Sequence, residues 1–164
     1  MRSSVVAALV TFGLAAPLQG QGMTPAANEE FLTAARSCAA ATSPTAVDPR
    51  KLEADGWKKA TMSSNGKPVA TPLTMYGKGH LLLMFDAAGT SPLCIVTGRL
   101  GSIGEFPKLQ AAFAAAYGAP IKDDGKGEQM FVAPDHRIVD LAATGSADRP
   151  AVRVGVGPVF QETK

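Results

Sequence analysis

Apolar and polar residues alternate along much of the second half of the chain, and this pattern predicts β-strands. The alternation is clearest in AVRVGVG, residues 151–157, where three valines share one side. Two apolar runs flank a turn near Gly89 and predict a β-hairpin. Because short turns join neighbouring strands, we expect an antiparallel sheet. Strands are predicted at residues 69–76, 81–86, 93–99, 128–133, 137–143 and 151–156.

Two longer segments carry apolar residues at helical spacing instead. One lies within residues 28–42, with Asn28 as the expected N-cap, and the other begins near Pro107. A shorter helix is expected after Asp48, which can cap it, with Pro49 at its first position. The apolar stripes of the two longer helices are Phe31, Ala34, Ala35 and Cys38, and Phe106, Leu109, Phe113 and Tyr117.

The first 22 residues have the order of a secretory signal peptide. Arg2 is their only charged residue, an apolar run of about a dozen residues follows, and Pro17 and small or polar residues end the run. The run is shorter than the roughly 20 residues that a membrane-spanning helix needs. A buried N-terminal helix is the alternative interpretation.

We therefore expect residues 1–22 to be a signal peptide that is cleaved, and residues 23–164 to form a single α+β domain. Gly20, Gly22 and Ala27 are the candidate residues before the cut. The mature chain contains no second long apolar run, so no membrane span is expected in it. Its expected location is the periplasm or the outside of the cell.

Composition and charge fit a folded domain and exclude one class of partner. Hydrophobic residues make up 46% of the chain and charged residues 18%, which is typical of a globular protein. The 16 basic and 14 acidic residues nearly balance. Nucleic-acid binding needs clustered positive charge, so nucleic acid is not an expected partner.

The two cysteines are predicted to form a disulfide bond. Cys38 lies on the apolar face of the first helix and Cys94 lies in a strand, 56 positions further along the chain. Cysteines in an oxidising compartment usually pair. A catalytic thiol needs a nearby histidine or helix N-terminus, and a metal site needs closely spaced ligands; neither surrounds Cys94. Closing a loop of this length stabilises a fold by about 4 kcal/mol in the chain-entropy model.

These features together predict the fold class: an α+β domain in which an antiparallel β-sheet carries two main helices, in the order α-β-β-β-α-β-β-β, with one disulfide bond.

The two faces of the central hairpin are expected to differ. Counting outward from the turn, one face is predicted to lie under the first helix, on the side of the disulfide. The other face is apolar in its middle, whereas a face in water would alternate to polar residues. The second helix is expected to cover it, and a ligand or partner is the alternative. The predicted pairs are Phe85 with Cys94 and Leu83 with Val96 on the first face, and Met84 with Ile95, Leu82 with Thr97 and His80 with Arg99 on the second.

No motif in the sequence identifies an activity. The chain has no G-x-S-x-G elbow and no phosphate-binding P-loop, and no cofactor is expected. We therefore predict a non-catalytic binding or protein-interaction module, with His80, Met84 and Arg99 as candidate binding residues for a protein partner or small ligand. No catalytic residue and no metal ligand is assigned.

Two other classes of function stay open. One is a hydrolase-type enzyme with a site around His80 and Asp86. The other is a periplasmic metal-binding protein, in which His80 and the methionines Met62, Met75 and Met84 supply nitrogen and soft sulfur ligands.

Overall fold

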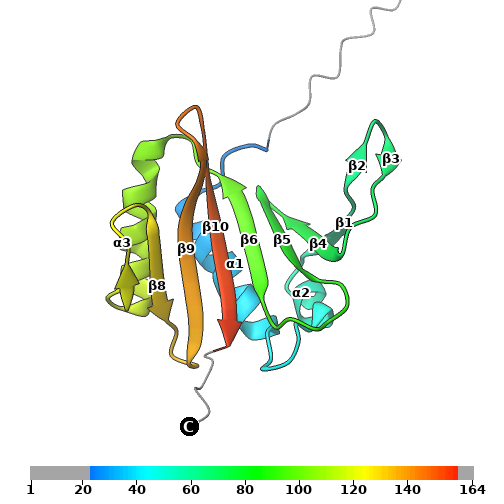
Figure 1. The fold of residues 1–164 in the computed structure, drawn as a ribbon, viewed down its shortest axis with the longest axis horizontal. Coiled ribbons are helices and arrows are strands. Elements are labelled where there is room, and N and C mark those ends of the chain that lie inside the picture. Colours follow the sequence, from blue (N-terminus) through cyan, green and yellow to red (C-terminus); the bar gives the residue numbers. More distant parts are fainter. Residues whose placement is uncertain (1–22, 159–164) are drawn as a thin grey trace, which may run out of the picture.

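The computed structural model describes residues 23–158, so the predicted signal peptide lies outside the described residues. This part of the chain forms an eight-stranded sheet with helices packed against it (Figure 1). The predicted α+β class, with an antiparallel sheet, two main helices and one disulfide, is confirmed. The elements are α1 (Asn28–Ala41), α2 (Pro49–Ala54), β1 (Lys58–Ala60), β2 (Ser63–Ser64), β3 (Lys67–Pro68), β4 (Leu73–Lys78), β5 (Leu81–Asp86), β6 (Cys94–Arg99), the 3₁₀ turn η1 (Ile103–Glu105), α3 (Phe106–Tyr117), β7 (Lys122–Asp123), β8 (Glu128–Val132), β9 (Arg137–Ser146) and β10 (Arg149–Pro158).

The strands lie in the order β1-β4-β5-β6-β10-β9-β8-β7, and β2 and β3 form a separate small hairpin. The predicted order of elements was approximate, because it lacked the short strands β1 and β7 at the two edges of the sheet and the β2–β3 hairpin. Within residues 23–158, no helix is long and apolar enough to cross a membrane.

Local capping explains where the helices begin. Asp48 accepts a hydrogen bond from the backbone N–H of Arg50 at 3.1 Å, so the predicted cap of α2 is confirmed. The predicted cap of α1 was wrong: Ala27 takes the N-cap position, and its N–H donates to the Glu30 carboxylate at 2.8 Å. The side chain of Glu30, at the third helical position, therefore binds back to the backbone of the cap residue at the start of α1.

The disulfide joins the first helix to the middle of the sheet. Cys38 of α1 and Cys94 of β6 are bonded, with their Cα atoms 5.7 Å apart. Both residues are fully buried. The predicted bridge is confirmed, and it ties two segments that are distant in sequence.

The register of the β5–β6 hairpin follows the prediction. Phe85 lies opposite Cys94, and Met84 lies opposite Ile95. The other two confirmed pairs are Leu83 with Val96 and Leu82 with Thr97. Pairing stops there, and His80 lies in the turn before β5, so the expected pair of His80 with Arg99 is not formed.

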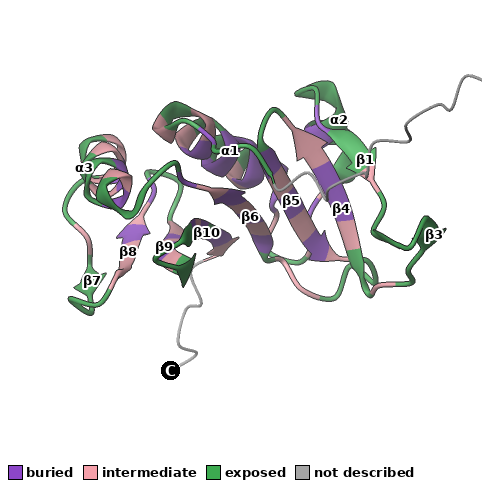
Figure 2. Cartoon of the chain, turned by 90° about the horizontal axis from the view of Figure 1, so that it is seen from above, coloured by how far each residue is buried: buried purple, intermediate pink, exposed green. Residues whose placement is uncertain are grey.

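All three α-helices lie on the same side of the sheet (Figure 2). Phe113 of α3 packs against Phe131 of β8, with ring centroids 6.0 Å apart, and belongs to the same core as Phe31 of α1. The expectation that the second helix covers the Met84 face was therefore wrong. Eight strands at about 4.8 Å spacing make a sheet far wider than one helix, so α1 and α3 are both needed to cover the core face.

Close contact between α1 and the sheet depends on one glycine. A Cβ atom placed on Gly98 of β6 would lie 2.3 Å from the Leu81 side chain and 2.9 Å from Cζ of Phe31. No side chain fits at this position without moving the core. Gly98 thus gives the ring of Phe31 its place against the strand.

Candidate binding site

The face of the sheet opposite the helices is the candidate site, and we call it the open face. No described helix covers it. Much of it is apolar, although an antiparallel sheet face in contact with water normally carries polar side chains. Its half-buried side chains include Leu82, Met84, Ile95, Thr97, Met130, Val132, Ile138 and Asp140.

A hollow of about 330 Å³ lies on the open face over β10. Its floor is formed by Gly155 and Gly157, which contribute no side chains. Gly155 lies between Ile95 of β6 and Asp140 of β9 in the strand pairing. The hollow therefore exists because two successive positions of β10 on this face lack side chains. Its remaining lining residues are Leu93, Met130, Ile138, Arg153 and Pro158.

The polar end of the hollow is an ion pair. A guanidinium N–H of Arg153 donates to Oδ2 of Asp140 at 2.9 Å. Oδ1 of Asp140 is buried and has no hydrogen-bond partner within residues 23–158. Burial raises the pKa of Asp140 above its ordinary value, and the charge of Arg153 only partly offsets this effect. One oxygen of the carboxylate is thus paired with Arg153, and the other is buried without a partner within residues 23–158.

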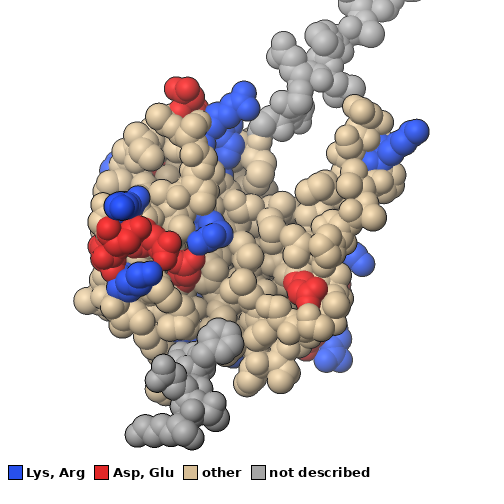
Figure 3. Space-filling view, in the orientation of Figure 1, with Lys and Arg blue, Asp and Glu red and all other residues tan. Residues whose placement is uncertain are grey.

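Charged side chains gather beside the hollow, over β7, β8 and β9, while the rest of the open face is largely uncharged (Figure 3). Hydrogen bonds from the Gln129 side chain and from the Gly125 N–H lower the pKa of Asp123. Asp124 accepts from the backbone N–H groups of Glu128 and Lys126, which lowers its pKa. These two carboxylates are stabilised in the charged form, in contrast to Asp140.

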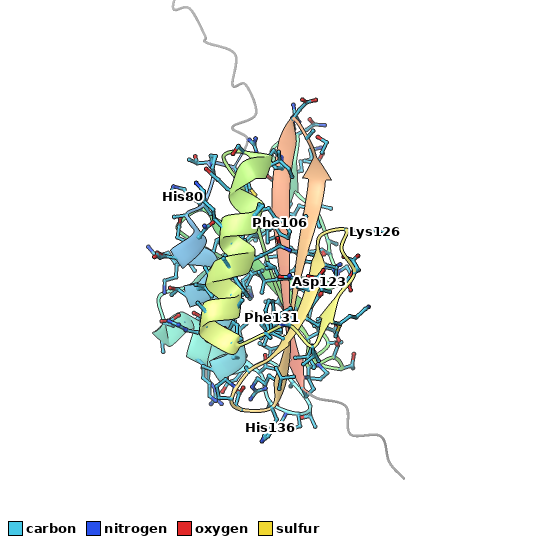
Figure 4. All side chains as sticks on the ribbon, turned by 90° about the vertical axis from the view of Figure 1, so that its left-hand side faces the viewer. His80, Phe106, Asp123, Lys126, Phe131 and His136 are labelled. Carbon is cyan, nitrogen blue, oxygen red and sulfur yellow. A yellow bond between two sulfur atoms is a disulfide. The ribbon has the colours of Figure 1, made fainter. Side chains whose placement is uncertain are left out.

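The structure places one of the three predicted binding residues at the centre of the open face. Met84 is half-buried there, beside Ile95, which lines the hollow. Arg99 lies at the end of β6, and its guanidinium approaches the carbonyl of Met23 at 3.4 Å. His80 lies outside the sheet, on the helical side of the molecule (Figure 4). The three residues do not form one cluster.

His80 interacts with the first helix. Its Nδ1 atom lies 3.2 Å from Oε2 of Glu30, and its backbone N–H lies 3.2 Å from Oε1 of the same residue. Although burial opposes the change, hydrogen bonds from Ala27 and His80 hold the pKa of Glu30 below its ordinary value. This contact holds the β4–β5 turn against α1, which explains the position of His80.

The residues of the enzyme hypothesis lie apart. His80 precedes β5 and Asp86 ends it, so about 20 Å of extended strand separates them. Asp86 accepts hydrogen bonds from the Thr90 hydroxyl and from the N–H groups of Thr90 and Ala88, which lower its pKa. Its carboxylate therefore stabilises the hairpin turn.

The residues of the metal hypothesis are only partly gathered. Met75 and Met84 are direct partners across β4 and β5. Met62 lies outside the eight-stranded sheet, and the ring of His80 is turned to Glu30. Within residues 23–158, no three His, Cys, Asp or Glu side chains are arranged to hold a metal ion.

The fold and the open face define a class: a small α+β protein with one layer of helices on an antiparallel sheet, one disulfide and an apolar sheet face without helical cover. No protein-family model, curated protein or solved structure matches the chain. The functional conclusion therefore depends on the chemistry of the site, because a fold class alone supports many functions.

Proposed function

We propose that this protein is a non-catalytic binding module that is exported to the periplasm or the outside of the cell, and that its open face binds a ligand or partner. The observation that carries this proposal is the placement of all three helices on one side of the sheet. Apolar side chains such as Met84 and Ile95 are left on the other side. Exposed apolar surface of this kind is typical of interaction sites.

Replacing Met84 by lysine should weaken the binding of a partner while leaving the fold intact. Met84 is half-buried on the open face, so a lysine there can extend its charged end into water. We expect the melting temperature to change by less than about 3 °C, as for a surface substitution. Cross-linking of the exported protein in extract from its own compartment should recover at least about tenfold less partner.

The matched control is Ala40→Lys, which adds the same charge to an exposed position of α1 on the helical side. It should leave both the melting temperature and the recovered partner unchanged. A partner recovered in equal amounts with Met84→Lys and Ala40→Lys would refute partner binding at this part of the open face.

Export can be tested by the intact mass of the protein. We expect the periplasmic or secreted form to begin after Gly20 or Gly22. A cut after Ala27 is disfavoured, because it would remove Ala26, which is 5% exposed and donates its N–H to the Arg99 carbonyl at 2.9 Å. A mass that still includes residues 1–16 in the exported fraction would contradict signal cleavage.

A further inference from the structure

The glycines that form the floor of the hollow are not required by the fold. Neither Gly155 nor Gly157 has a positive φ angle. A Cβ atom on either would approach no closer than 3.7 Å to another atom, which is ordinary van der Waals contact. Gly98, by contrast, leaves no room for a side chain. Because glycine weakens a strand and often marks the close approach of a ligand, the two floor positions indicate a site for binding.

The size and lining of the hollow favour a small molecule. Its volume of about 330 Å³ is at the lower end of the range for small-molecule sites. Ile95 lies on one side of the glycine floor and Ile138 on the other. A flat aromatic ring or a short alkyl chain could therefore lie on the floor between them.

The Asp140 carboxylate at the polar end of the hollow accepts fewer hydrogen bonds than it can. A carboxylate offers about four acceptor positions, and within residues 23–158 Asp140 receives a single hydrogen bond, from Arg153. Oδ2 of Asp140 lies 3.7 Å from the point that a Cβ atom on Gly155 would occupy. A donor group resting over Gly155 would thus be within easy reach of this oxygen.

The charges around the hollow favour a cationic donor. Asp140 and Arg153 are the charged residues that line the hollow. Together with the charged group of β7 and β8 beside it, four acids stand against three bases, which leaves one negative charge in excess. Arg153 is 45% exposed in its side chain. The acids are Asp123, Asp124, Glu128 and Asp140, and the bases are Lys122, Lys126 and Arg153.

We propose that this hollow binds a small organic amine, with its apolar body on the Gly155–Gly157 floor and its ammonium group hydrogen-bonded to Asp140. The inference rests on the proposed binding function and names the ligand class for the same face. A charge-assisted hydrogen bond in a partly buried position gives both affinity and preference for the cation.

Three probes that share a phenylethyl group test the ligand class on the full exported protein: 2-phenylethylamine, 2-phenylethanol and 3-phenylpropionate. Titration followed by NMR or calorimetry should show the amine binding at least about tenfold more tightly than the acid, with the alcohol between them. Asp140→Asn should remove the preference for the amine and leave the affinity for the alcohol within about threefold.

A second variant tests the position of the site. Gly155→Val fills the floor with a side chain that suits a strand, so it should retain the melting temperature and lose affinity for all three probes. Amine binding that is unchanged in Gly155→Val would overturn the site. Acid binding as tight as amine binding, or no amine binding up to about 10 mM, would overturn the ligand class.

A shortened chain that ends at Pro158 tests whether residues 159–164 occupy the hollow in place of the amine. If only this shortened chain binds the amine, residues 159–164 fill the hollow in the full protein, and the proposal fails. If the amine binds neither the full protein nor the shortened chain, while Met84→Lys still reduces partner recovery, the ligand class is wrong and the proposed binding function stands.

Discussion

Replacing Cys94 by serine should lower the free energy of unfolding by about 2–5 kcal/mol. The bridge links α1 to the central strand β6 and closes a long loop, so its loss increases the conformational freedom of the unfolded chain. The serine hydroxyl would also be placed where Cys94 is fully buried, without an assured partner. Urea unfolding followed by circular dichroism measures the difference directly.

The control for buried polarity is the double variant Cys38→Ala, Cys94→Ala, which removes the bridge without adding a hydroxyl. This double variant should show most of the decrease in the free energy of unfolding that is expected for Cys94→Ser. Thiol titration of the denatured, non-reduced protein should find no free thiol, because both cysteines are bonded. Two free thiols, or a loss below about 1 kcal/mol in the double variant, would contradict a stabilising bridge.

Replacing Leu83 by lysine should prevent folding. Leu83 is fully buried on the core face of β5, opposite Val96, and is adjacent in sequence to Met84 on the open face. Burying an unpaired ammonium group costs several kcal/mol, a large part of the 5–15 kcal/mol that stabilises a typical domain. Far-UV circular dichroism and size-exclusion chromatography of Leu83→Lys and Met84→Lys should show an unfolded and a folded protein, respectively.

The same pair of variants tests the register of the sheet. A shift of one residue exchanges the two faces of a strand. If Leu83→Lys folded normally and Met84→Lys did not, the assignment of the core face and the open face would be reversed.

The faces of the hairpin could be predicted from the sequence because side chains alternate strictly in a strand. Once the turn near Gly89 was placed, Phe85 had to lie opposite Cys94, and Met84 had to lie on the other side. The disulfide then showed which face carries the first helix. The alternation and the disulfide together therefore place Met84 on the open face.

The face of the sheet on which the second helix packs could not be predicted in the same way. It depends on the width of the whole sheet, and the edge strands β1 and β7 contain only three and two residues. Strands so short leave no periodic pattern. A sheet without these two strands is narrow enough for one helix to cover each face.

One local signal in the sequence was missed. Asn65 and Gly66 have φ angles of 51° and 74° and form the turn of the β2–β3 hairpin. An Asn-Gly pair is typical of such turns. The residues around the Asn-Gly pair are polar and exposed, so they show no alternation of apolar and polar residues that would predict strands on either side.

The hollow itself was also missed, because it requires the pairing of several strands. Asp140 and Arg153 are 13 residues apart and meet only in the β9–β10 register. The two-residue turn between Ser146 and Arg149 could have indicated that register. Glycine within a strand pattern is more often taken as a bulge than as the floor of a site.

Oxidation of methionines offers a direct test of the open face, because the chain carries its own controls. Met84 and Met130 are half-buried on the open face. Met62 is 50% exposed and lies in the β2–β3 region, while Met75 is 5% exposed. Peroxide converts accessible methionine to the sulfoxide, which mass spectrometry locates residue by residue.

The measurement compares oxidation of the purified protein with oxidation of the same protein in extract from its own compartment. If the open face binds a partner, Met84 and Met130 should oxidise in the purified protein and both be protected in the extract. A small ligand confined to the hollow should protect Met130 alone, because Met130 lines the hollow and Met84 does not. Met62 should oxidise equally in both samples, and Met75 should resist in both. Equal oxidation of Met84 and Met130 in the two samples would contradict a binding role for the open face.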